Sequence, residues 1–194
     1  MGQATVNLQN LGRLVSVSNA LPVILSAPTS TATAGYSASA SKTRPNDTTP
    51  YAALDVIAES DSVGTVWTFT GVGPSGGGKV IIDALTLEID VAAIPSGMGA
   101  FRLHLYSTSP TAINDNAAFN LPSGDRAKYL GYVETPTPID LGATLWSETE
   151  SMSFPVRKQV TLASNIVYGI LQTVNAFTPT AQAVKSVTIH SVGV

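Results

Sequence analysis

The chain has 194 residues, of which 12% are charged, with a formal net charge of −3 and no cysteine. The absence of cysteine excludes disulfides, thiolate metal sites and a cysteine nucleophile. Lysine and arginine are few and scattered, which argues against a nucleic-acid binder, because such a protein needs clustered positive charge to displace counterions. The sequence contains no run of 18 apolar residues, so we predict no membrane span.

The first part of the chain, residues 1–26, is interpreted as an N-terminal arm, followed by a polar connector at 27–50. The connector is rich in small and polar residues that can bury little apolar area. The arm has short alternating stretches, but a lone strand pair is marginal in water, so we expect it to add to the sheet edge of another subunit. The alternative is that it folds back as an edge strand of its own domain. The residues expected to make subunit contacts are Val6, Leu8, Leu14, Val15 and Val17.

The remainder, residues 51–194, is predicted to form an all-β domain, an antiparallel β-sandwich resembling a jelly roll. In LTLEIDV (85–91) and FRLHLY (101–106) apolar and polar residues alternate, which is typical of half-buried strands, and a hairpin is expected to join them. NIVYGILQTV (165–174) is apolar on both faces and is therefore predicted to be a central or interface strand. A single helical turn is expected near 114–119. Further strands are predicted at 51–58, 65–72, 128–134, 152–162 and 184–192.

Two polar loops contain residues of the kinds found in ligand sites. GPSGGGKV (73–80) nearly matches the Walker A phosphate loop, but Val80 stands where the pattern needs Ser or Thr. A strand rather than a helix is predicted to follow, so the stretch is interpreted as a hairpin loop. Asn114, Asp115 and Asn116 could offer oxygen ligands to calcium, but they lack the EF-hand spacing and are interpreted as a polar turn.

The histidines and acidic residues give no pattern typical of a catalytic or metal site. His104 and His190 lie on the polar faces of their predicted strands and are expected to face solvent or another subunit. Glu88 and Asp90 would meet Arg102 and His104 across the predicted hairpin as charge pairs. We therefore assign no catalytic, cofactor-binding or metal-binding residue, and expect a protein that is not an enzyme.

Four sequence pieces resemble virion structural proteins of tailed bacteriophages, and the resemblance extends over about residues 40–194. Leu54 departs from it, since a small or turn-forming residue is expected there. The pieces are TRP at 43–45, Y-x-A-x-D-V-I at 51–57, D-N-A-A-F at 115–119 and D-R-A-K-Y-L-G at 125–131.

The resemblance implies a structural protein of the virion, made in the cytoplasm of the bacterial host. Within that group we expect a capsid decoration or cement protein, homo-oligomeric, with the major capsid protein or other virion proteins as partners and no cofactor, nucleic acid or membrane. One alternative is a tail, fibre or baseplate component. Another is a glycan-binding β-sandwich, in which Trp146 would be the exposed aromatic, while Trp67 is expected in the core.

Overall fold

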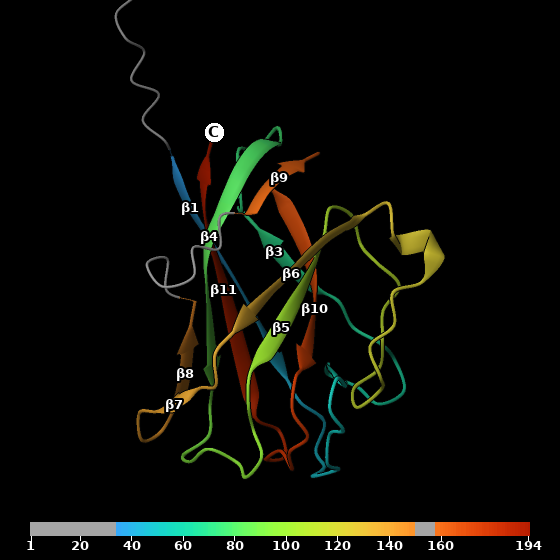
Figure 1. Cartoon of the computed structure of the whole chain (residues 1–194), viewed down its shortest axis with the longest axis vertical. Helices are drawn as coiled ribbons and strands as arrows, with labels where there is room; N and C mark the ends of the chain where they lie inside the picture. The colour runs from blue at the N-terminus through green and yellow to red at the C-terminus, as the bar shows by residue number, and fades with distance from the viewer. Residues whose placement is uncertain (1–33, 150–157) are drawn as a thin grey trace, which may run out of the picture. The chain divides into compact units, whose positions relative to one another are not determined.

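The computed structural model describes residues 34–149 and 158–194, which form two antiparallel β-sheets (Figure 1). Helical structure in these residues is limited to a 3₁₀ turn, η2 (Ser123–Asp125), and none of their helices could cross a membrane. The strands are β1 (Gly35–Thr43), β2 (Val56–Ile57), β3 (Trp67–Thr70), β4 (Gly78–Ile89), β5 (Phe101–Tyr106), β6 (Tyr129–Thr135), β7 (Ile139–Asp140), β8 (Leu145–Glu148), β9 (Lys158–Leu162), β10 (Ile166–Thr173) and β11 (Val184–Gly193).

The strand order is that of a jelly roll. The first sheet runs β1-β11-β4-β8-β7, with β9 also paired to β4, and the second runs β2-β10-β5-β6, with β3 also paired to β10. When β2 and β3, which pair with successive parts of β10, are taken as one interrupted strand, and β7 and β9 are taken as short additions to the first sheet, the two sheets read 1-8-3-6 and 2-7-4-5 in chain order. This order is the double Greek key of the jelly roll, so the predicted fold class is confirmed.

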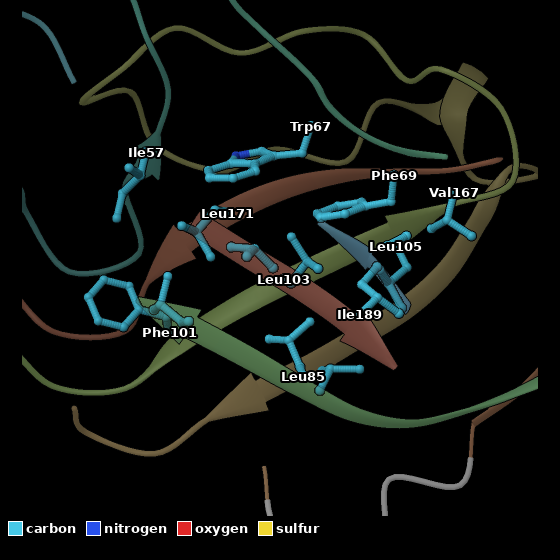
Figure 2. Close-up of a cluster of buried hydrophobic side chains, with 14 of the residues drawn as sticks. Ile57, Trp67, Phe69, Leu85, Phe101, Leu103, Leu105, Val167, Leu171 and Ile189 are labelled. Atoms are coloured by element: carbon cyan, nitrogen blue, oxygen red, sulfur yellow. The ribbon is translucent and has the colours of Figure 1, made fainter. Parts of the chain in front are cut away.

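The core lies between the two sheets (Figure 2). Leu85 and Ile189 reach it from the first sheet, and Leu103 and Leu105 from the second, all with 0% of their surface exposed. Successive side chains of a strand face opposite sides, so alternation along one strand decides which residues are buried. The predicted inward facing of Leu103 and Leu105 is therefore confirmed, as is the core position of Trp67.

The predicted strand partners are wrong at two connections. β4 pairs with β8, β9 and β11, whereas β5 pairs with β6 and β10, so the loop between β4 and β5 crosses from one sheet to the other and is not a hairpin. The glycine-rich loop between β3 and β4 also changes sheets, although a strand does follow it as predicted. Alternation along a strand reveals its buried face but carries no information about its neighbour.

Strand β1 lies inside the segment 27–50 that the sequence predicts to be a connector. Its nine residues, GYSASASKT, pair without interruption with β11. Only Ala38 is fully buried, and the strand is held mainly by its backbone pairing rather than by an apolar face. The small side chains that suggest a linker are therefore those of an edge strand. The predicted arm, residues 1–26, lies outside the described residues.

Strand β10 is central, as predicted, and its two apolar faces have different partners. Leu171 points into the core between the sheets, whereas Ile170 packs outside the second sheet with Val56 and Tyr106. Ile113 and Phe119, from the long connection between β5 and β6, cover this outer group. A second, smaller apolar cluster thus explains why β10 shows no polar face. The expected helical turn near 114–119 is a turn at 115–116 without a helix.

The turn before β2 holds Leu54 in the left-handed backbone region, with φ of 72°. The Leu54 N–H donates to the Thr173 carbonyl at 3.1 Å, and the Leu54 carbonyl accepts from Phe119 N–H at 3.1 Å and from Gln172 Nε2 at 2.9 Å. These contacts keep leucine in a conformation that its Cβ disfavours. The turn that the resemblance implies is therefore present, although its residue is unusual.

We predict that Leu54→Gly raises the free energy of unfolding by about 0.5–1 kcal/mol. Relief of the left-handed strain, about 1–2 kcal/mol, exceeds the added entropy of glycine in the unfolded chain. The matched control Leu54→Ala keeps a Cβ at the same φ and should give no gain. Urea unfolding monitored by tryptophan fluorescence measures both, and an equal gain in the alanine variant would contradict the strain.

Candidate functional site: a buried charge network

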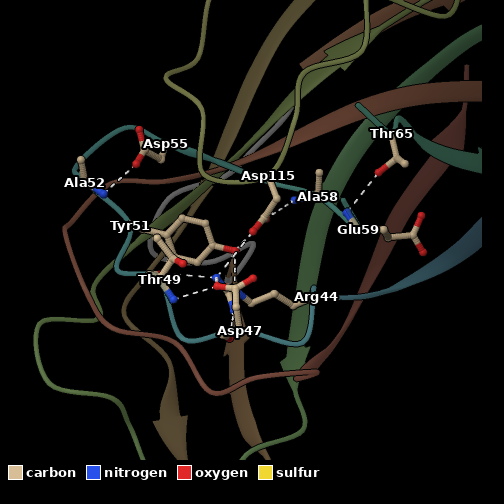
Figure 3. Close-up of polar contacts among 10 residues, drawn as sticks. All are labelled: Arg44, Asp47, Thr49, Tyr51, Ala52, Asp55, Ala58, Glu59, Thr65 and Asp115. Carbon is tan, nitrogen blue, oxygen red and sulfur yellow. Dashed lines mark hydrogen bonds and ion pairs between the residues drawn. The ribbon is translucent and has the colours of Figure 1, made fainter. Parts of the chain in front are cut away.

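Arg44, the residue after β1, is buried with 2% of its surface exposed, and its guanidinium is almost completely satisfied (Figure 3). Nε donates to the Tyr51 hydroxyl at 3.0 Å, and Nη1 donates to the Asp47 carbonyl. Nη2 donates to Asp47 Oδ1 at 2.9 Å and to the Thr49 carbonyl at 3.2 Å, and lies 3.6 Å from Asp115 Oδ2. The planar, five-donor group suits such a site, which a lysine could not fill.

Asp115 is the anionic centre of the same network. Its Oδ1 accepts from the Tyr51 hydroxyl at 2.8 Å and from the Ala58 N–H at 2.7 Å. Burial raises the pKa of the Asp115 carboxyl, and the hydrogen bonds from Ala58 and Tyr51 and the charge of Arg44 oppose that rise. The segment is a turn, as predicted, but its carboxylate is 4% exposed and enclosed by protein. No group of three metal-ligating side chains occurs in the described residues.

Lys185 of β11 adds a second buried cation. It is 2% exposed, and its Nζ has no hydrogen-bond partner within residues 34–149 and 158–194. Burial lowers the pKa of its ammonium to about 8, an effect that the Asp115 charge opposes and the Arg44 charge strengthens. A signal for this residue was present in the sequence, since period two places Lys185 on the same face as Val187 and Ile189.

The residues that carry the phage resemblance meet in this network and beside it. Arg44, Tyr51 and Asp115 come from three of the four pieces and contact one another. Asp55 accepts from Ala52 N–H at 2.6 Å and forms a bridge with the segment of Asp115 through Ala118. The contacts join positions up to 71 residues apart, which no local pattern in the sequence reveals.

The fourth piece, D-R-A-K-Y-L-G at 125–131, also positions a loop, in the connection between β5 and β6. Asp125 Oδ2 accepts from the Thr111 N–H at 2.8 Å, and its Oδ1 pairs with Lys128 Nζ at 3.2 Å. The backbone hydrogen bond from Thr111 is the main reason that the pKa of Asp125 is lowered. All four pieces thus position loops.

His104 is not on an exposed face, which corrects the prediction. Its ring is 5% exposed, stacks on Phe119 with centroids 3.7 Å apart, and lies 3.0 Å from both the Gln172 Oε1 and the Tyr129 hydroxyl. Burial lowers the pKa of the imidazole, and the charge of Arg102 lowers it further. The sequence predicts a solvated polar face on β5, but the connection between β5 and β6 covers it.

The predicted charge pairs across β4 and β5 do not form, because the two strands lie in different sheets. Arg102 pairs instead with Glu134 of β6, with Nε 2.7 Å from Oε2. Glu88 is half-buried on the outer face of the first sheet, and Asp90 is exposed just after β4. His190 is half-buried in β11, an intermediate outcome for a residue expected to face solvent or a subunit.

The remaining candidates give little support to a binding site. Trp146 is half-buried in β8, opposite Glu88 and Ile139, whereas the glycan-binding alternative expects an exposed aromatic there. The residues predicted to make subunit contacts, Val6, Leu8, Leu14, Val15 and Val17, lie outside the described residues.

No family model matches the chain, and no curated protein matches it. Similar solved structures include the K3 adhesin domain of Lys-gingipain from Porphyromonas gingivalis w83, with 12% identity and a TM-score of 0.26 over 68% of this chain and 65% of that one, slightly under two thirds of its length. A turnip yellow mosaic virus chain has 9% identity and a TM-score of 0.25, and the match covers 83% of this chain and 80% of that one. A chain of sacbrood virus of honeybee has 10% identity and a TM-score of 0.25, and the match covers 84% of this chain and 72% of that one.

We predict that Tyr51→Phe lowers the free energy of unfolding by about 1.5–3 kcal/mol, because it removes a hydrogen-bond partner from both a buried guanidinium and a buried carboxylate. The phenyl ring keeps its packing against Phe177. The control Tyr132→Phe, at a side chain that is half exposed, should change stability by less than about 0.5 kcal/mol. Equal effects in denaturant unfolding would show that the Tyr51 hydroxyl contributes nothing.

We predict that Lys185→Met raises the free energy of unfolding at pH 7 by about 1–4 kcal/mol, because it removes a buried cation that lacks a hydrogen bond. The gain should depend on pH. Between the folded pKa of about 8 and the unfolded pKa of about 10.5, the unfolded wild-type chain binds more protons, so wild-type stability rises with pH.

The advantage of Lys185→Met should therefore shrink by about 2 kcal/mol between pH 7 and pH 9.5. Urea unfolding of both proteins at the two pH values measures this change. An advantage that is constant with pH would show that Lys185 titrates normally in the folded protein.

Proposed function

We propose that this chain is a non-enzymatic structural protein of a tailed-bacteriophage virion. The observation that supports the proposal is the meeting of Arg44, Tyr51 and Asp115 in one buried network. These residues belong to separate pieces of the sequence that resemble phage virion proteins. Because they contact each other in space, the pieces that carry the resemblance also hold this fold together, which supports the proposal.

Within the virion we propose the role of a capsid decoration or cement protein, bound to the major capsid protein and stabilising the shell. The outer face of the first sheet suits many weak, repeated contacts. Ser39 and Ser41 of β1 bond to Thr188 and Ser186 of β11 at 2.8 and 2.7 Å. Hydroxyl pairs of this kind leave the β1–β11 part of this face polar but uncharged, so that a partner loses little solvation energy there.

The proposal predicts saturable binding of the full chain to purified shells of the parent phage that were assembled without it. We expect a fixed number of copies per shell and a higher temperature of shell disruption, measured by co-sedimentation and differential scanning fluorimetry. Cryo-electron microscopy of the complete particle then shows the position. Density for the chain on the tail, with none on the shell, would favour the tail or baseplate alternative and exclude a decoration role.

The arm can be tested in the same assay with a chain that begins at residue 27. A start near Pro50 would remove β1 and with it an edge of the first sheet, so the truncation has to end before residue 34. We expect the shortened chain to keep its melting temperature and its β-rich circular dichroism but to lose shell binding. If it unfolds instead, the arm belongs to the domain.

A further inference from the structure

Strand β1 is the one long, regular edge of the sandwich in the described residues. The other edges carry the features by which proteins block edge-to-edge pairing. β7 has two residues, β2 and β3 have two and four, and β9, which pairs only with β4, has five. β6 is interrupted by a register shift, and its Gly131 has φ of 94°. β1 has nine residues, no proline and no register shift.

Half of the β1 backbone groups point away from the sheet. The Gly193 N–H of β11 donates to the Ala34 carbonyl, and the Arg44 N–H donates to the carbonyl of Ala183, the residue before β11. In an antiparallel ladder the hydrogen-bonded residues alternate, so the even residues of β1 bond to β11 and the odd residues face the open edge. No other described strand pairs with these odd residues.

The side chains of β1 do not protect this edge. Lys42 carries the only charge of the strand, and its Nζ turns back to Glu59 Oε2 at 2.7 Å and lies 5.7 Å from the centre of the Trp67 ring. Ala38 and Ala40 face the core, and the serines of the strand face outward. Among residues 34–149 and 158–194, the edge therefore presents small side chains and backbone groups without a strand partner.

We propose that β1 pairs with β1 of a second copy of this chain, antiparallel about a two-fold axis through Ser39. The strand reads SASAS at 37–41, which is the same in both directions. In this register Ser39 faces itself, serine faces serine, alanine faces alanine, and Tyr36 faces Lys42. Such a contact is isologous, as closed two-fold dimers require.

The register follows from the backbone as well as from the side chains. Ser39 is an odd residue, so the axis passes through a hydrogen-bonded pair, and the five odd residues of the two copies make about ten hydrogen bonds. An axis at Ser37 or Ser41 would shorten the overlap and leave odd residues of β1 without partners. The two first sheets then join into one continuous sheet across the dimer.

The main test is disulfide trapping, because the chain has no cysteine and an introduced one is unique. Ser39→Cys places two sulfurs on opposite residues about 5.5 Å apart between Cα atoms, within reach of a disulfide. The matched control is Thr188→Cys, at the residue of β11 that pairs with Ser39 on the same outer face. In the proposed dimer the two copies of residue 188 are three strand spacings apart, whereas the two copies of residue 39 are one spacing apart.

We expect the full-length Ser39→Cys protein to form a covalent dimer under mild oxidation, and the control to remain monomeric on denaturing gels. Sedimentation equilibrium of the wild-type chain should show a reversible dimer. Ser39→Pro removes an N–H that faces the open edge and leaves the bonds to β11 intact. It should weaken the dimer at least roughly tenfold, because one inter-strand hydrogen bond is lost per copy and two are lost in the dimer.

If Ser39→Pro lowers the melting temperature, Ser39→Lys replaces it, since it sets two like charges opposite each other without altering the backbone. A monomeric wild-type chain, equal cross-linking of the two cysteine variants, or a dimer that neither substitution weakens would overturn the pairing. A dimer lost only when residues 1–33 are removed would assign the contact to that segment and also overturn it. Because the inference rests on β1 alone, a monomer that still binds shells would leave the proposed function intact.

Discussion

The buried guanidinium of Arg44 is the contact on which the rest of the structure depends. It joins the end of β1 to the turn at Asp47 and, through Tyr51, to the carboxylate of Asp115. A buried ion pair contributes little net stability, but leaving one of its charges without a partner is costly. Its main effect is therefore to specify how these loops are arranged, because an arrangement that separated the buried charges would leave one of them without a partner.

The outer face of the second sheet follows from the same contact. Asp115 fixes the segment that carries Ile113 and Phe119, and these side chains cover Ile170 of β10. The ring of Phe119 also encloses His104, so an imidazole on the outer side of its sheet becomes buried. The apolar second face of β10 and the burial of His104 are thus two consequences of one anchored loop.

The facing of the strands could be predicted from the sequence, whereas their partners could not. Alternation in FRLHLY is a local property of the chain, and it correctly buries Leu103 and Leu105. The partners of β4 and β5 depend on how distant segments wrap, and β1 lacks the apolar set that would reveal a strand. The network escaped prediction for the same reason, although Lys185, a charge in register with core residues, pointed to it.

The sequence pieces that suggest a virion protein and the surfaces that could hold a virion together are different parts of the molecule. The side chains of Arg44, Tyr51 and Asp115 are buried and contact one another. A partner instead meets exposed elements such as the open edge of β1, whose serines and alanines form no distinctive motif. Motif residues of this kind therefore identify the fold, while the partner has to be found from exposed backbone and hydroxyl groups, for which geometry rather than sequence similarity is the guide.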